Sequence, residues 1–173
     1  MALPGLNIFR NSWTKLPILA TLCGILLLIY TRLNAATSDI TGTVYNLIKQ
    51  NGFNEPLAGF VLAQSAHETA IAGIPFQSVL LKQNNNLFGM KYAGQLYARG
   101  EKNGFAYYDN IEYSIADFAA WWQRHKPEFI NILFPVDSVE RYVSILKDND
   151  YFEASETSYR AGVNHFYNSF FHE

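Results

Sequence analysis

A glutamate in an apolar helix is the residue of this sequence whose surroundings best suit acid–base chemistry. Glu68 follows the largely apolar residues 57–66, near the end of a predicted helix. Burial disfavours the charged form of a carboxyl group and so raises its pKa, and a general acid needs a raised pKa near neutral pH. Spacing alone favours a simpler interpretation, a solvated glutamate at a helix end, because surface carboxylates are common.

The remaining histidines and the cysteine offer no second centre of chemistry. His125, His165 and His172 lack the spacing of metal ligands. The single cysteine, Cys23, excludes an intrachain disulfide and a cysteine-based zinc site. We therefore predict no metal and no cofactor. His67 directly precedes Glu68, and adjacent helical residues do not face each other, so we predict a structural or solvent-facing role for it.

The elements that must position Glu68 are mostly helical. A helix predicted over residues 54–68 carries it, and a capping box at residues 114–117 predicts the start of a later helix. Between them, aromatic-rich residues 96–108 predict two strands joined by a hairpin tip at residues 100–104. Further helices are predicted near residues 38–51, 77–82, 127–134, 137–146 and 159–170. This pattern predicts an α+β domain, mostly helical with one β-hairpin.

Composition places this domain among globular proteins. The chain has 173 residues, of which 49% are apolar and 16% aromatic. That is enough apolar material for one domain with a core, and intrinsic disorder is excluded because disordered chains are poor in aromatic residues. The formal net charge of −2 argues against a nucleic-acid partner.

The N-terminal segment differs from the rest of the chain in charge. Residues 1–37 contain no acidic residue, and 16 uncharged residues lie between Lys15 and Arg32. As a helix they would cover roughly 24 Å. We predict a single transmembrane helix at about residues 16–31, an N-terminus on the cytoplasmic side and a domain at residues 38–173 on the extracytoplasmic side. The alternative is a signal peptide cleaved near residues 34–36.

Two motifs around Glu68 resemble a known family. Gln64 stands four residues before Glu68, and residues 85–91 read Asn-Asn-Leu-Phe-Gly-Met-Lys. This combination resembles the glucosaminidase family of peptidoglycan hydrolases, a lysozyme-like group. Further along, Tyr108 followed by the Ser-x-x-Asp of residues 114–117 resembles the family's later pattern, as do the C-terminal tyrosines. The resemblance covers roughly residues 41–170.

The resemblance implies roles for individual residues. Glu68 matches the family's catalytic glutamate, which protonates the leaving glycosidic oxygen. The other implied substrate-binding residues are Gln64, Asn85, Asn86, Phe88, Gly89 and Tyr108. Asn86 offers both hydrogen-bond donors and acceptors for sugar groups, and Gly89 permits a close backbone approach or a positive φ. Turn and core roles for Asn86 and Tyr108 remain open.

The resemblance also implies a second catalytic carboxylate, which in the family lies on a mobile hairpin. Glu101 lies 33 residues after Glu68, at the predicted hairpin tip. An inverting glycosidase needs its carboxyl groups about 6.5–9.5 Å apart, and a closing hairpin can supply one of them. Glu101 is equally well a solvated turn residue. Asp109 and Glu112 are alternatives, and the 2-acetamido group of the substrate is another.

The sequence therefore predicts a membrane-anchored hydrolase of the β-1,4 bond after N-acetylglucosamine in peptidoglycan glycan strands. Its partners would be those strands and a lipid bilayer, with no nucleic acid. One alternative is a lytic transglycosylase that uses the same acid. Another is a non-catalytic glycan-binding or structural membrane protein. A cell that remodels its wall and a lipid-containing phage that penetrates one both fit this prediction.

Overall fold

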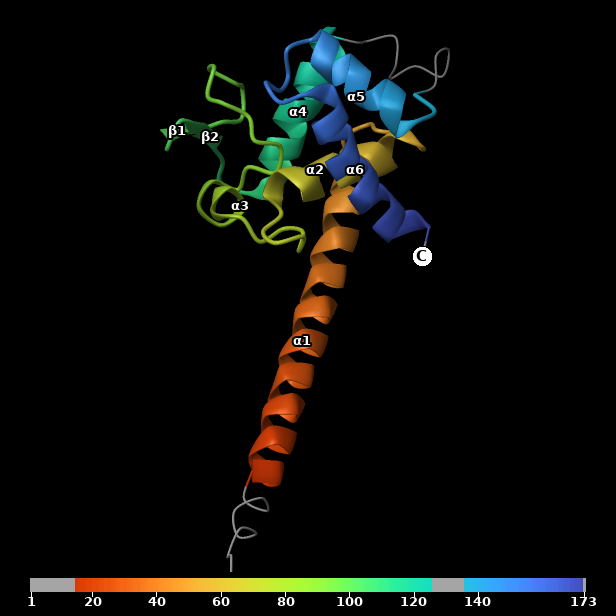
Figure 1. The fold of residues 1–173 in the computed structure, drawn as a ribbon. Helices are drawn as coiled ribbons and strands as arrows, with labels where there is room; N and C mark the ends of the chain where they lie inside the picture. Colours follow the sequence, from red (N-terminus) through yellow and green to blue (C-terminus); the bar gives the residue numbers. More distant parts are fainter. Residues whose placement is uncertain (1–14, 126–135, 173) are drawn as a thin grey trace, which may run out of the picture. The chain divides into compact units, whose positions relative to one another are not determined.

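The computed structural model describes the backbone of residues 15–125 and 136–172; within these, the side chains of residues 15–24, 30 and 33–38 are not described. The described elements are six helices and one two-stranded antiparallel sheet (Figure 1). In chain order they are α1 (Lys15–Gln50), α2 (Leu57–Thr69), α3 (Val79–Asn84), β1 (Gly100–Lys102), β2 (Phe105–Tyr107), α4 (Ile111–His125), α5 (Val139–Asp148) and α6 (Glu156–Phe171). The α+β prediction is confirmed.

The chain divides into two compact units, residues 1–39 and residues 40–173. Helix α1 runs without a break from Lys15 to Gln50, so the helix start predicted near Ser38 is wrong. Within the described residues, no helix is long and apolar enough to cross a bilayer. The span predicted at residues 16–31 is therefore not found, and most of its side chains lie outside the description. The short helix predicted at residues 127–134 also lies outside it.

Helix α2 is the centre of the second unit. Every residue from Leu57 to Ala66 is buried, so this part of the helix is covered on every side. Helix α6 packs along it, with α3 and α5 against other parts of it. Val44 and Ile48, from the last turns of α1, are fully buried in the same core. Glu68 thus projects from the end of a tightly fixed helix.

The hairpin is tighter than the sequence predicts. Strands β1 and β2 pair with Gly100 opposite Tyr107 and Lys102 opposite Phe105. The turn is the dipeptide Asn103-Gly104, with φ of 57° and 81°. Two consecutive left-handed residues are typical of the two-residue turns that Asn-Gly favours. Glu101 consequently lies on β1, opposite Ala106, and not at the tip.

Helix α4 begins earlier than the predicted capping box. It starts at Ile111, and the side chain of Asn110 accepts a hydrogen bond from the Tyr113 N–H at 3.1 Å. Ser114 therefore lies inside the helix. Its buried hydroxyl accepts a hydrogen bond from the Leu87 N–H at 3.0 Å instead. Ser114 thereby connects α4 to the Asn-Asn-Leu-Phe-Gly segment.

Candidate active site

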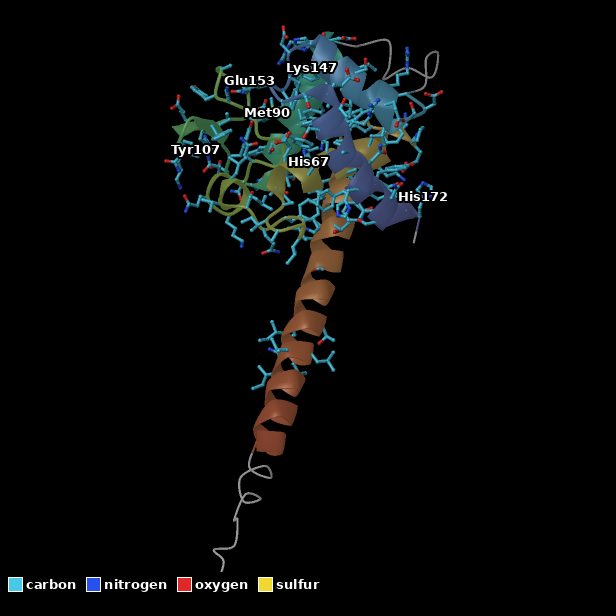
Figure 2. All side chains as sticks on the ribbon, in the orientation of Figure 1. His67, Met90, Tyr107, Lys147, Glu153 and His172 are labelled. Atoms are coloured by element: carbon cyan, nitrogen blue, oxygen red, sulfur yellow. The ribbon has the colours of Figure 1, made fainter. Side chains whose placement is uncertain are left out.

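Glu68 lines a cavity of about 530 Å³ in the second unit. Four segments form its walls: the end of α2, residues 88–95, one residue of α4, and the connection between α5 and α6. Met90 and Glu153, from two of these segments, are labelled in Figure 2. The lining residues are Glu68, Phe88, Gly89, Met90, Lys91, Ala93, Gln95, Trp121, Asp150, Tyr151, Phe152 and Glu153.

The carboxyl group of Glu68 is held by a tyrosine of α6. The Tyr159 hydroxyl donates a hydrogen bond to Glu68 Oε1 at 2.5 Å. Burial raises the pKa of Glu68 above its ordinary value, and the hydrogen bond from Tyr159 partly opposes that rise because it stabilises the carboxylate. Glu68 is thus a carboxyl group with a raised pKa that faces a cavity, as a general acid requires.

Gly89 lies directly against the other carboxylate oxygen. Its φ is +64°, in the left-handed region that favours glycine. A Cβ placed on Gly89 would stand 2.9 Å from Glu68 Oε2. Only glycine therefore leaves this oxygen uncovered on the cavity side. The structure thus brings Gly89 and Glu68 together at the cavity.

The hydroxyls of three tyrosines that are affected by the charge of Glu68 stay protonated. Burial, followed by the charge of Glu68, raises the pKa of Tyr142, Tyr151 and Tyr159 well above the ordinary value. The Tyr151 hydroxyl donates to the Phe88 carbonyl at 2.7 Å and so fixes the cavity wall. From the sequence, these tyrosines were only part of a resemblance to the family. The structure shows that Tyr151 binds the Phe88 carbonyl and that Tyr159 binds Glu68.

Asn85 and Asn86 hold the chain rather than face the cavity. Asn86 is fully buried, and its amide nitrogen donates to the carbonyls of Met90 and Ala106 at 2.9 and 3.0 Å. Its amide oxygen accepts from the N–H groups of Phe88 and Met90, both at 3.2 Å. Asn85 donates to the Tyr108 carbonyl at 2.9 Å. The turn role, left open by the sequence, is therefore the one these contacts support.

Gln64 and Tyr108 are also absent from the cavity wall. Gln64 is fully buried, and its side-chain oxygen accepts a hydrogen bond from the Tyr142 hydroxyl. Tyr108 is only 3% exposed, with its hydroxyl 3.8 Å from the sulfur of Met90. Phe88 does line the cavity, and its ring stacks on Phe118 with centroids 4.2 Å apart. Of the six predicted substrate-binding residues, only Phe88 and Gly89 line the cavity.

The predicted second carboxylate, Glu101, is exposed on β1 and does not line the cavity. Neither alternative reaches it. Asp109 is paired with Arg99, whose Nε donates to Asp109 Oδ2 at 2.7 Å, and this hydrogen bond lowers the pKa of Asp109. Glu112 is exposed on the first turn of α4.

Two carboxylates that the sequence analysis did not select share the cavity with Glu68. Asp150 lies in the connection after α5, with φ of +54°. Glu153 follows it and forms an exposed ion pair with Lys91, with Nζ and Oε1 2.9 Å apart. They lie more than 80 residues from Glu68 in the sequence, so no local spacing could have indicated them.

His67 packs on the backbone of α6. A Cβ added to Gly162 would lie 2.2 Å from His67 Cε1, so the imidazole fills the space that glycine leaves. The ring also meets Tyr159 edge-on, with centroids 5.0 Å apart. Burial lowers the pKa of His67. The predicted structural role is confirmed, and the histidine supports the tyrosine that binds Glu68.

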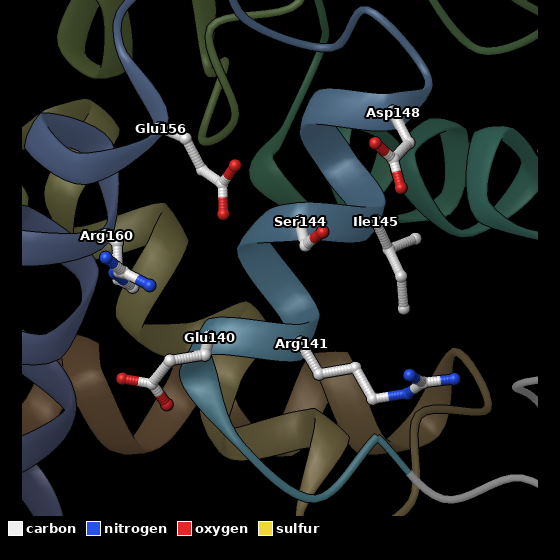
Figure 3. A pocket seen from close by; sticks show the side chains of 7 residues that line it. All are labelled: Glu140, Arg141, Ser144, Ile145, Asp148, Glu156 and Arg160. Carbon is white, nitrogen blue, oxygen red and sulfur yellow. The ribbon is translucent and has the colours of Figure 1, made fainter.

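A separate groove of about 430 Å³ lies on α5 and the start of α6 (Figure 3). It shares no lining residue with the cavity at Glu68. Three acidic and two basic side chains lie around it, so the groove carries charges of both signs. The residues are Glu140, Arg141, Ser144, Ile145, Asp148, Glu156 and Arg160.

Comparison with known proteins agrees with the geometry. The model of the glucosaminidase family, described as mannosyl-glycoprotein endo-beta-N-acetylglucosaminidase, matches residues 44–171. No curated protein and no solved structure matched the chain. The matched region includes Glu68, the Asn-Asn-Leu-Phe-Gly segment and the tyrosines of α5 and α6. The chain therefore belongs to the glucosaminidase family and is a glycoside hydrolase of the peptidoglycan-hydrolase type.

Proposed function

We propose that this protein hydrolyses the β-1,4 bond after N-acetylglucosamine in peptidoglycan glycan strands, with Glu68 as the general acid. One observation carries the proposal. The Glu68 carboxyl group, with a pKa raised by burial, faces a cavity whose wall is formed by the Phe-Gly-Met-Lys part of the family motif. This is the arrangement that protonation of a glycosidic oxygen needs.

The two oxygens of Glu68 have different surroundings, and this suggests how the proton moves. Oε1 accepts the hydrogen bond from Tyr159. Oε2 lies beside Gly89, where a side chain is absent. In our proposal Oε2 carries the proton and gives it to the leaving oxygen as the glycosidic bond breaks. Tyr159 then stabilises the carboxylate that remains, because a hydrogen bond to the charged form favours it.

Activation of water has more than one candidate. Asp150 and Glu153 line the cavity, whereas Glu101 would need the hairpin to move toward it. The acetamido group of the substrate is the route that needs no second carboxylate. Single Asp150→Asn, Glu153→Gln and Glu101→Gln variants, assayed for kcat on one substrate, separate these routes. A drop of about a hundredfold identifies the base, and unchanged rates in all three favour the acetamido route.

The products of the reaction test the proposal. The full chain and its Glu68→Gln variant are incubated with purified peptidoglycan, and the released muropeptides are identified by mass spectrometry. We expect N-acetylglucosamine at the new reducing ends, and release about a thousandfold slower by the variant. Anhydro-muramyl ends would instead show a lytic transglycosylase. Binding to peptidoglycan without release would show a glycan-binding protein.

We further propose that the N-terminal segment anchors the enzyme to a membrane, with its catalytic domain on the extracytoplasmic side. The support is sequence-based: 16 uncharged residues between Lys15 and Arg32, and no acidic residue before Asp39. The full chain should remain with membranes after an alkaline carbonate wash, and a chain lacking residues 1–37 should not. Recovery of a mature protein that starts near residue 36 would show a signal peptide instead. The same wash, applied to membranes of whole cells and to purified virions, distinguishes the two settings, a cell and a lipid-containing phage.

A further inference from the structure

Two tyrosines form an exposed stacked pair beyond the cavity. The rings of Tyr97 and Tyr113 lie with centroids 5.5 Å apart and planes 17° from parallel. Tyr97 is 40% exposed and Tyr113 is 36% exposed. Tyr97 belongs to the loop between residue 91 and β1, and Tyr113 to the first turn of α4. Although the two rings contact each other, both remain partly exposed and together offer an aromatic surface to solvent.

The pair is fixed in place before any ligand binds. Both carboxylate oxygens of Asp117 accept a hydrogen bond from the Tyr97 N–H, at 3.2 and 3.3 Å. Asp117 is itself only 2% exposed, so this anchor is buried. The Tyr113 N–H is held by the Asn110 side chain at 3.1 Å. A ring pair with a fixed backbone loses little conformational entropy when it binds a ligand.

The pair is connected to the active-site cavity through one short loop. Ala93 and Gln95 line the cavity, and Tyr97 follows Gln95 by two residues. This loop is braced internally: the Gln95 side chain accepts from the Ala93 N–H at 2.8 Å and donates to the Lys91 carbonyl at 2.5 Å. The tyrosine pair is therefore joined to the cavity wall by a chain segment of only two residues.

The chemistry of the pair indicates what it binds. A tyrosine ring combines an apolar face with a polar hydroxyl, which suits a sugar ring with its C–H face and hydroxyl edge. A glycan strand is longer than the cavity at Glu68 and must continue outside it. We propose that Tyr97 and Tyr113 form a distal subsite, at which a sugar of the strand stacks while the scissile bond lies at Glu68. This inference rests on the proposed function and extends it to the length of strand the enzyme prefers.

The subsite predicts a dependence on substrate length. Tyr97→Ala and Tyr113→Ala, made in the full chain, are compared on peptide-free peptidoglycan glycan strands and on chitotetraose. On the long strands KM should rise about fivefold, since losing one aromatic contact costs about 1 kcal/mol. On chitotetraose both variants should match the wild type, and Tyr97→Phe and Tyr113→Phe should match it on both substrates.

Tyr92→Ala provides the matched control, because Tyr92 is 42% exposed on the same loop and lies outside the stacked pair. Thermal unfolding followed by circular dichroism confirms that each variant is folded. An unchanged KM on long strands, or the same loss on both substrates or in Tyr92→Ala, would overturn the subsite. Failure of the proposed function is recognised separately, since the wild type would then cleave neither substrate.

Discussion

At the scale of single residues, Glu68 combines two opposing requirements. Burial raises its pKa, which suits a proton donor, but an ionised carboxyl group in that position destabilises the fold. Tyr159 reduces this cost through its hydrogen bond to Oε1. Gly89 keeps Oε2 uncovered. The site is therefore adjusted by a small number of contacts, each of which one substitution can test.

The first prediction concerns stability. A carboxyl group whose pKa is raised in the folded state stabilises the fold below its ordinary value of 4.5, and this contribution is lost as the pH rises through the folded-state pKa. Glu68→Gln removes the ionisation and should therefore raise the free energy of unfolding and the Tm at pH 7, with a smaller effect at pH 4. Calorimetry at both pH values measures it. The exposed Glu101→Gln serves as control, and a variant less stable than the wild type at pH 7 would contradict the account.

The second prediction concerns the pH dependence of activity. Tyr159→Phe removes the hydrogen bond that lowers the pKa of Glu68, and it keeps the ring that stacks on Phe152. The pKa of Glu68 should rise further. Because a general acid acts while protonated, the alkaline limb of the kcat profile should move to higher pH. The Tyr142 hydroxyl binds Gln64 and not Glu68. Tyr142→Phe should therefore leave the alkaline limb at the same pH. A limb that stays or moves downward in Tyr159→Phe would argue against Glu68 as the acid.

The third prediction separates backbone strain from contact with the acid. Gly89→Ala places a methyl group 2.9 Å from Glu68 Oε2 at a φ of +64°. Gly73→Ala introduces comparable strain at a φ of +78°, with nothing within 4 Å of the new Cβ. Both variants should lose about 1–2 kcal/mol of stability. Only Gly89→Ala should lower kcat, by tenfold or more. Equal kcat values in the two variants would show that Gly89 serves the fold alone.

At the scale of elements, the segment from α3 to β2 supports the cavity through buried hydrogen bonds. Asn86 is its centre, with four bonds to backbone groups of Phe88, Met90 and Ala106. Asn84 adds a bond to the Lys102 carbonyl at 2.9 Å, and Ser114 receives the Leu87 N–H. The first half of the family motif is thus a structural support, and its Phe-Gly-Met-Lys part lines the cavity.

The fourth prediction tests this support. Asn86→Ala leaves two buried carbonyls and two buried N–H groups without their side-chain partner. The Met90 carbonyl keeps the Ala106 N–H as a donor and the Ala106 carbonyl keeps Asn84, so the Phe88 and Met90 N–H groups bear the loss. The variant should lower the free energy of unfolding by about 2–4 kcal/mol, since each unsatisfied buried donor is costly. Asn149→Ala, which removes one bond to the Ile145 carbonyl, should cost about 1 kcal/mol. Urea denaturation of both variants measures the difference. If Asn86→Ala and Asn149→Ala lost similar amounts of unfolding free energy, Asn86 would not be the main support of this segment.

Elements were easier to predict from the sequence than their ends. The apolar run of α2 and the amphipathic pattern of α5 are strong local patterns, and both helices formed as expected. The capping box at Ser114 failed because its hydroxyl binds Leu87, a partner 27 residues away. The hairpin tip was placed too broadly because Asn103-Gly104 alone makes the turn. Local patterns thus identified elements, and long-range contacts decided their boundaries.

At the scale of the whole molecule, the cavity joins residues that no local pattern connects. Its walls come from α2, the loop before β1, α4 and the connection before α6. Glu68 and Gly89 were predicted because a family motif names them. Asp150 and Glu153 were not, since only the packing of α5 and α6 against α2 brings their connection to the acid. Gln64 and Tyr108 were predicted to bind the substrate. In the structure both are buried, and neither lines the cavity.

The most direct test of the account asks whether Glu68 donates the proton to the leaving group. The wild type and Glu68→Gln are compared on a natural glycan and on a substrate of the same sugars with a dinitrophenolate leaving group, which departs without protonation. Glu68→Gln should lower kcat on the natural glycan by about a thousandfold, with a far smaller loss on the activated substrate. Equal losses on both substrates, or full activity on the natural glycan, would contradict the assignment of Glu68 as the general acid.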